Sequence, residues 1–250
     1  MANIAGPKTI SELDLYTTTT QIPGGFAIGD VVYGPNGKQF RLALVGASNL
    51  VMGNMLQSSA VDTQFTNMAI PTAVTAAQVT AGTYQIDVTN GTTTVTTGKF
   101  IGGSMSVYTA GTVAVGDEYT ILDHTTGTSG QTLTLYLDRP LRAAFTTSAK
   151  VNMRRSPWSG VIQSPATTLT GSPAGVAMFA ATAATYCFVQ THGVGAVLSD
   201  GSSILVGSPV AVPSGTAGAV ILGAAGLANV GYAMQAGAAA KAIAVQLKID

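Results

Sequence analysis

Charge is what this chain has least of. Only 9% of its 250 residues are Asp, Glu, Lys or Arg, and eleven basic residues balance eleven acidic ones, whereas typical soluble domains are about 25% charged. Free monomers usually keep a charged surface and a net charge, because both oppose self-association. Nucleic-acid binding is also disfavoured, because its affinity comes largely from Lys and Arg that neutralise phosphates. We therefore expect a protein that works packed in an assembly, with no nucleic acid among its partners.

Residues that carry chemistry are nearly as scarce. The single cysteine, Cys187, excludes an intramolecular disulfide, and its apolar surroundings predict a buried hydrophobic role. Two isolated histidines, His124 and His192, do not supply the closely spaced ligands that zinc needs. No Gly-x-Ser-x-Gly elbow is present, and no pair of facing carboxylates is evident. We predict that the protein is not an enzyme, with no catalytic residue, metal site or cofactor.

Targeting signals are missing too. The N-terminal sequence has no basic start followed by an apolar run, so no secretory signal is predicted. Residues 217–240 carry no charge, and about 20 such residues can cross a bilayer. That segment is mostly Ala and Gly and contains Asn229 and Gln235, with few residues that drive insertion. We weigh a membrane span as the alternative, and expect strands of small residues and no membrane partner.

What the sequence does contain is short apolar runs separated by turn residues. Three pairs of runs flank turn residues and predict hairpins: 26–33 with 38–45 around Asn36-Gly37, 83–88 with 92–97 around Asn90-Gly91, and 196–198 with 204–206 around residues 199–201. Asn-Gly is a strong hairpin signal because both residues accept positive φ. Residues 133–137 alternate apolar and polar, as a strand with one buried face does.

One short pattern recurs at irregular spacing: apolar residues, a glycine, a small or acidic residue, and another apolar residue. Its glycines are Gly29, Gly53, Gly116 and Gly207. Glycine within a strand pattern commonly marks a bulge or bend, and repeated corners suit a sandwich or small barrel. We predict a mainly β fold of two or three small β-sandwich or β-barrel modules with an extended N-terminal arm.

Interruptions in the series of apolar runs and turns divide the chain into four predicted parts. They are an extended arm at 1–25, a first β-module at 26–70, a middle β-module at 71–155 and a C-terminal β-module at 156–250. The arm contains four consecutive threonines, which are β-branched and polar. Pro23-Gly24-Gly25 then breaks any regular element. Because it has little apolar surface to bury, we expect it to become ordered only on a neighbouring subunit.

Short motifs in the C-terminal part resemble a recurrent series in the virion proteins of tailed bacteriophages. They are GVIQSP (160–165), GVA (175–177), YCFVQTHG (186–193) and AVL (196–198). The close of the chain, VGYAMQAG (230–237) followed by IAVQL (243–247), looks like the end of phage head decoration (cement) proteins, and residues 133–141 fit the same group. The resemblance covers about residues 25–250.

This resemblance implies a β-rich protein, dimeric or trimeric, that binds the outer lattice of the major capsid protein and has no active-site residues to carry over. We therefore expect a decoration protein on the capsid surface of the virion, made in the host cytoplasm. The alternative is a tail-fibre or host-surface adhesin, although fibres usually show long repeats, which this chain lacks. A third reading is an enzyme that degrades host polysaccharide.

The basic residues are unevenly spread. Five of the eleven lie in one stretch with no acidic residue among them: Arg139, Arg142, Lys150, Arg154 and Arg155. One interpretation is a solvated rim of the middle module. The other is an electrostatic contact with acidic groups on the capsid or on a neighbouring copy, for which the planar fork of arginine is suited.

Overall fold

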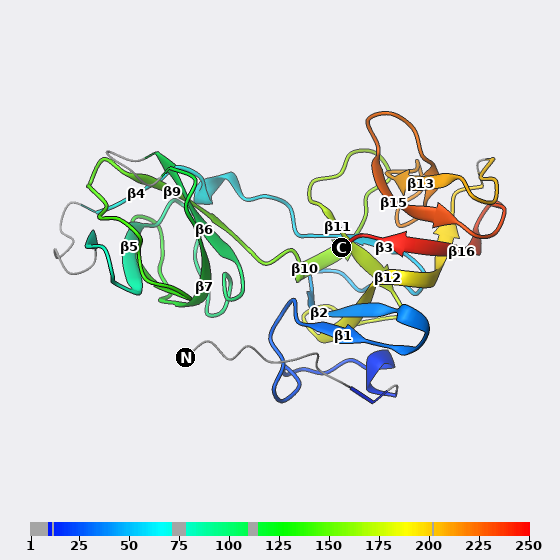
Figure 1. Ribbon diagram of the computed structural model, residues 1–250, viewed down its shortest axis with the longest axis horizontal. Coiled ribbons are helices and arrows are strands. Elements are labelled where there is room, and N and C mark those ends of the chain that lie inside the picture. Colours follow the sequence, from blue (N-terminus) through cyan, green and yellow to red (C-terminus); the bar gives the residue numbers. More distant parts are fainter. Residues whose placement is uncertain (1–9, 12, 72–78, 110–114, 202) are drawn as a thin grey trace. The chain divides into compact units, whose positions relative to one another are not determined.

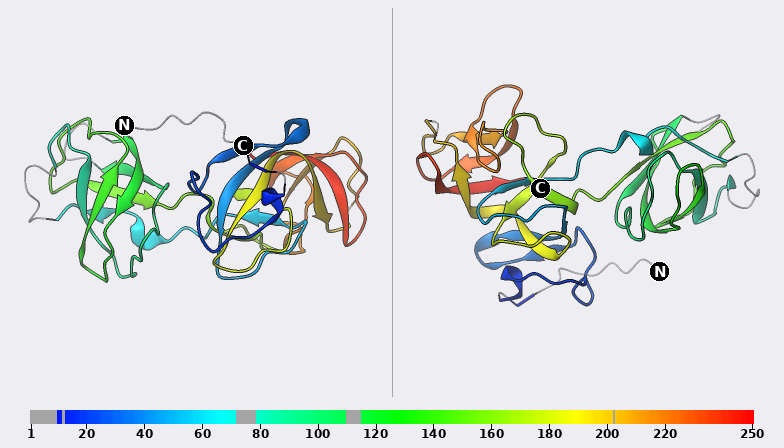
Figure 2. Two further views of the ribbon diagram at one scale, coloured as in Figure 1. Left: turned by 90° about the horizontal axis from the view of Figure 1, so that it is seen from below. Right: turned by 180° about the vertical axis from the view of Figure 1, so that it is seen from behind.

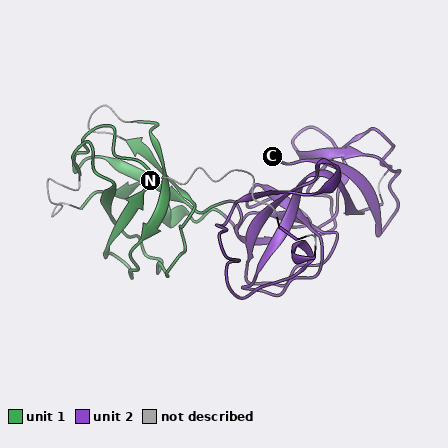
Figure 3. Ribbon diagram, turned by 60° about the horizontal axis from the view of Figure 1, so that its bottom comes forward, with its two compact units in different colours: residues 1–2, 61–156 green, residues 3–60, 157–250 purple. Residues whose placement is uncertain are grey.

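The computed structural model describes residues 10–11, 13–71, 79–109, 115–201 and 203–250. The chain is mainly β and divides into two compact units (Figure 3). Unit 1 is Val61–Ser156, and unit 2 joins the chain up to Ala60 with Pro157–Asp250. Unit 1 is therefore an insertion between two parts of unit 2. The predicted fold class, mainly β with small barrels, is confirmed.

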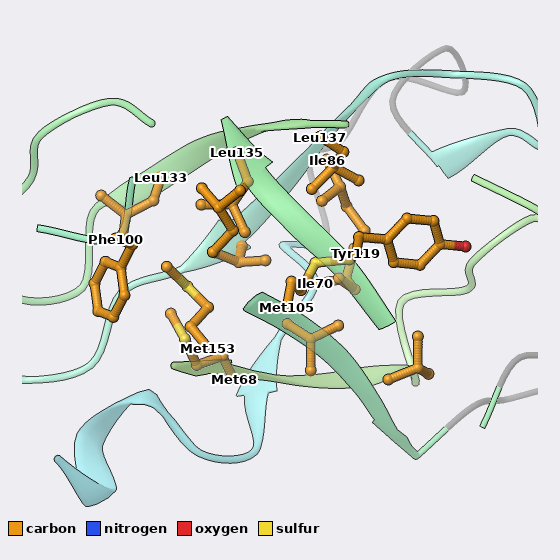
Figure 4. Packing of buried hydrophobic residues seen from close by; sticks show 14 of the residues in the cluster. Met68, Ile70, Ile86, Phe100, Met105, Tyr119, Leu133, Leu135, Leu137 and Met153 are labelled. Atoms are coloured by element: carbon orange, nitrogen blue, oxygen red, sulfur yellow. The ribbon is translucent and has the colours of Figure 1, made fainter. Parts of the chain in front are cut away.

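Unit 1 is a nearly closed barrel of six strands in the order β4-β9-β6-β7-β8-β5. Its elements are η3 (Thr63–Phe65), β4 (Met68–Ala69), β5 (Gln85–Thr89), β6 (Ser104–Thr109), β7 (Glu118–His124), β8 (Thr132–Leu137) and β9 (Lys150–Arg154). Alternate residues of each strand fill the interior, which Figure 4 shows with Leu133, Leu135 and Leu137 of β8 pointing inwards. The alternation predicted for residues 133–137 is confirmed.

Unit 2 is a larger sheet of ten strands (Figures 1 and 2). Its elements are η1 (Asp14–Tyr16), β1 (Val31–Tyr33), η2 (Pro35–Gly37), β2 (Gln39–Val45), β3 (Met55–Gln57), β10 (Ser159–Gln163), β11 (Pro173–Ala177), β12 (Tyr186–Ser199), β13 (Pro209–Val212), β14 (Ile221–Leu222), β15 (Ala228–Ala233) and β16 (Lys241–Lys248). Strands β2, β10, β3, β11 and β12 close into a five-stranded barrel. The second half of β12 continues into an extension through β16, β15, β13 and β14.

This division differs from the consecutive modules expected from the sequence. Residues 26–60 and 157–250 do not form separate modules, because β2 pairs with β10 and β12, and β3 pairs with β10 and β11. Residues 61–70 belong instead with the middle segment, where β4 pairs with β9. The predicted boundaries differ from the observed ones because pairing between strands far apart in the chain produces no pattern in either local sequence.

Of the three predicted hairpins, the structure contains one. β1 and β2 pair antiparallel around Asn36 and Gly37, whose φ values of 58° and 73° are positive as the turn requires. The other two predictions are wrong: β5 pairs with β8 while Val95 bridges to Gly127, and the second half of β12 pairs with β16.

The four recurrent glycines all have positive φ, between 80° and 89°. Two residues after each glycine a strand begins: β1, β3, β7 and β13 respectively. In the turns at Gly29, Gly53 and Gly207, the residue after the glycine donates its N–H to the carbonyl three residues earlier, at 3.0, 3.2 and 3.1 Å. This combination is a type II turn, which needs positive φ at its third residue. The recurring pattern therefore marks tight turns that start strands.

The uncharged segment at 217–240 contributes β14 and β15 to the extension of unit 2. Within the described part of the chain, none of the helices has the length and apolar character to cross a membrane. The preference for strands of small residues is confirmed here.

The described part of the N-terminal arm packs on the barrel of unit 2; residues 1–9 and 12 lie outside the described residues. Thr19 and Tyr186 exchange two backbone hydrogen bonds, of 3.0 and 2.8 Å. Leu15, in η1, is 3% exposed and belongs to a cluster with Phe40, Leu42 and Phe188. From residue 13 onwards the arm is thus held by its own chain, which differs from the expectation that it needs a neighbouring subunit.

We predict that Leu15→Ala lowers the free energy of unfolding of unit 2 by about 2–4 kcal/mol, the usual cost of a buried Leu→Ala change. Leu13→Ala is the matched control, because Leu13 is 76% exposed and such changes stay within about 0.5 kcal/mol. Urea unfolding followed by fluorescence of Trp158, the sole tryptophan and part of unit 2, measures both. Equal stabilities of the two variants would show that the arm adds nothing to the fold.

Candidate partner-binding surface

The structure separates the five clustered basic residues into three environments on unit 1. Arg139 and Arg142 follow β8, Lys150 and Arg154 are the first and last residues of β9, and Arg155 comes directly after it. These positions face different neighbours. The cluster seen in the sequence is therefore not one charged patch.

Arg139 and Arg142 hold the segment after β8 against the start of β7. The Arg142 guanidinium forms an ion pair with Asp117, with 2.9 Å between Nη1 and Oδ1. Its backbone N–H donates to the hydroxyl of Tyr119 at 3.0 Å, and that ring is 1% exposed. The Arg139 guanidinium lies 4.8 Å from the centre of the same ring and donates to the carbonyl of Glu118. Burial, the largest influence, raises the pKa of Tyr119. These two arginines therefore stabilise unit 1 through contacts within the unit.

Arg155 belongs to a small ionic cluster where the chain enters and leaves unit 1. Lys99 Nζ lies 3.7 Å from Asp62 Oδ2, and the Lys99 side chain is only 7% exposed. Its ammonium also lies 4.2 Å from the centre of the Phe65 ring. Burial lowers the pKa of Lys99 and the nearby Arg155 lowers it further, while Asp62 opposes both effects. Burial likewise lowers the pKa of Arg155, and Asp62 again opposes it.

This cluster joins the two ends of the inserted segment. Asp62 caps the N-terminus of η3, where its side chain accepts a hydrogen bond from the Gln64 N–H at 3.0 Å. Arg155 precedes Ser156, the last residue of the unit. Sequence reasoning missed Asp62 and Lys99, because neither is close in sequence to the basic stretch. No local sequence pattern links Asp62 or Lys99 to Arg155, because the three residues come together only in the folded unit.

Lys150 and Arg154 remain on the outer face of β9. Its burial pattern places Val151 and Met153 inside, so Lys150, Asn152 and Arg154 point outwards. Across the sheet, Ser104 of β6 lies opposite Arg154, and Ser106 lies opposite Asn152. Within the described residues, neither Lys150 nor Arg154 takes part in an ion pair. Two cations separated by hydroxyl and amide groups make this face suited to carboxylate groups of a partner.

His124 has a structural role. Its side chain is buried, its Nε2 accepts from the Phe100 N–H at 3.1 Å, and its Nδ1 lies 3.0 Å from the Thr125 carbonyl. The neutral ring that donates from Nδ1 satisfies both contacts. This agrees with the expectation of a packed polar residue.

Cys187 lines a cavity of about 350 Å³ between the arm and the barrel of unit 2. The other lining side chains include Leu42, Phe26 and Phe188, with Asp14 and Thr17 as polar members. Burial raises the pKa of the Cys187 thiol to about 12, so the thiolate that nucleophilic chemistry needs is not formed near neutral pH. Among the described residues, no group of three or more His, Cys, Asp or Glu is placed to hold a metal ion.

Comparison of the chain with models of protein families, with curated proteins and with solved structures gives no match.

We predict that Asp62→Asn lowers the free energy of unfolding of unit 1 by about 1–2 kcal/mol, because Lys99 and Arg155 lose their counter-charge. The cost stays below that of a fully buried ion pair because the Asp62 side chain is 36% exposed. Chemical unfolding followed by far-UV circular dichroism measures this. In a Lys99→Met background the same change should cost clearly less. Identical costs in both backgrounds would mean that Lys99 and Asp62 do not interact.

Proposed function

We propose that this chain is a structural protein of a bacteriophage particle, which binds the assembled capsid shell in many copies and stabilises it as a decoration (cement) protein. The resemblance of its C-terminal motifs to phage virion proteins supports this role. So does a composition with 9% charged residues, which suits a protein that works in an assembly.

The observation that carries the proposal furthest is the outer face of β9. Lys150 and Arg154 stand at its two ends, with Asn152 between them. In a chain with eleven basic residues, this face offers a partner two cations that form no ion pair within the described residues. Acidic groups on the outer surface of the major capsid protein would complement it. Such complementarity mainly steers encounter and sets register, and salt weakens it.

Stabilisation would follow by mass action. A protein that binds the assembled lattice but not its free subunits shifts the equilibrium towards the lattice. Phage particles that carry the protein should therefore withstand heat or loss of salt better than particles stripped of it. Equal resistance to rupture would contradict the cement role.

The alternative, a tail-fibre or host-surface adhesin, differs in copy number. Densitometry of purified particles should find the protein at a copy number comparable to that of the capsid protein if it decorates the shell. A few to a few dozen copies would assign it to the tail.

We predict that Arg154→Glu slows association with stripped particles about tenfold at low salt, because electrostatic steering is lost. Lys241→Glu, the same change of charge at an exposed position of unit 2, is the matched control and should associate like the wild type. Surface plasmon resonance on immobilised particles measures both rates. The difference should shrink at high salt, and equal association of the two variants at both salt concentrations would remove this face from the interface.

A further inference from the structure

The extension of unit 2 presents a sheet face without charge at its centre. β12, β16 and β15 lie side by side (Figure 1), and their register fixes which side chains share the outer face. On β12 and β16, Val194 is opposite Gln246, Ala196 is opposite Ala244, and Leu198 is opposite Ala242. The residues facing inwards between them, such as Val197, Ile243 and Val245, are buried in the core.

On the far side of β16, β15 adds two larger apolar side chains to this face. Tyr232 lies opposite Gln246, and Met234 donates its N–H to the Ala244 carbonyl at 2.8 Å. Tyr232 is 43% exposed and Met234 is 52% exposed. Lys248, whose ammonium lies 5.4 Å from the centre of the Tyr232 ring, marks the end of the face.

Exposed apolar turns border the face on both sides. Beyond β12, the Leu198 N–H donates to the Gly53 carbonyl at 2.8 Å, and this turn carries Val51 and Met52, 54% and 66% exposed. Beyond β15, the Gly207 N–H donates to the Ala233 carbonyl at 2.7 Å, and that turn carries Leu205 and Val206, 66% and 67% exposed. We call this whole surface the apolar face. Gathered exposed apolar residues of this kind mark interaction sites.

The outer face of unit 1 shows that this is not simply how the chain builds a barrel exterior. Outward positions there mix charged and polar residues, such as Lys150 and Arg154 on β9 and Glu118 on β7, with exposed apolar ones such as Leu122 and Tyr136. On the apolar face, the corresponding positions of β12, β16 and β15 carry apolar residues and Gln246, and the first charge is that of Lys248 at the end of the face. An acidic or basic partner has nothing to pair with there, so the complementary surface is itself uncharged.

The apolar face is suited to a second copy of itself. Three alanines, Ala196, Ala242 and Ala244, form a low area at its centre, and the larger side chains of Tyr232 and Met234 stand beside it on the β15 side. In a twofold pairing, the larger side chains of each copy can enter the low area of the other, and no like charges come together at the centre. We propose that two copies of this chain pack face to face through the apolar face, as an isologous dimer. This pairing does not depend on the capsid role.

The area agrees with such a pairing. Three strands and two flanking turns span about 24 Å at about 4.8 Å each, and seven residues span about 23 Å along the strands. Each copy would then contribute about 550 Å² in projection, and the pair about 1,100 Å², which is close to the lower limit of about 1,000 Å² for specific interfaces.

The test is sedimentation velocity of the full chain over a wide range of concentration. The wild type should shift from the monomer mass of 25.1 kDa towards twice that value. Ala196→Lys places a charge at the centre of the face, and should raise the dimer dissociation constant at least about tenfold. Met234→Lys, at an already half-exposed position, should act in the same direction.

Ala81→Lys is the matched control, because Ala81 is an exposed alanine of unit 1; it should leave the dimer unchanged. Trp158 fluorescence and far-UV circular dichroism verify that each variant is folded. A wild type that stays monomeric throughout overturns the proposal, as does an Ala196→Lys variant that dimerises like the wild type. A monomeric wild type whose Ala196→Lys variant loses particle binding would assign the apolar face to the capsid instead.

Discussion

Unit 2 depends on one strand that serves two sets of partners. The first half of β12 pairs with β2 and β11 and closes the barrel, while the second half pairs with β16 and begins the extension. Between the halves the register shifts at Gln190 and His192. The Gln190 side chain, which is fully buried, donates to the carbonyls of His192 and Val194, both at 3.0 Å. The Gln190 amide nitrogen thus satisfies two backbone carbonyls of β12 where the strand changes partners.

Glycine makes this change of partner sterically acceptable. A Cβ on Gly195 would lie 3.0 Å from the Gln190 side-chain oxygen, and Gly193 has a φ of 84°. Beyond this point the second half of β12 leaves the barrel and pairs with β16. This half carries Val194, Ala196 and Leu198, so the strand that joins barrel and extension also supplies one row of the apolar face.

The few charges in the chain are used where segments distant in sequence must be held together. Arg41 pairs with Asp250, donates to the Gly29 carbonyl at 2.7 Å and stacks 4.2 Å from the Trp158 ring. Lys99 with Asp62, and Arg142 with Asp117, do the same in unit 1. Lys150 and Arg154, on the outer face of β9, take part in none of the ion pairs among the described residues. The centre of the apolar face carries no charged residue. One chain therefore carries two surfaces of different chemistry.

Features that depend on a few neighbouring residues could be predicted from the sequence. Alternation placed the three leucines of β8 inside, and Asn36-Gly37 formed its hairpin, because backbone geometry and pleating act locally. Asn90-Gly91 carries the same signal, yet the buried Asn90 amide donates to the carbonyls of Thr93, Gly127 and Thr128. That outcome could be seen only in the folded chain. The same holds for the pairing of residues before 61 with residues after 156, and for the separation of the five basic residues into three environments. Each rests on pairing between segments far apart in the chain, where long-range packing overrides local preference.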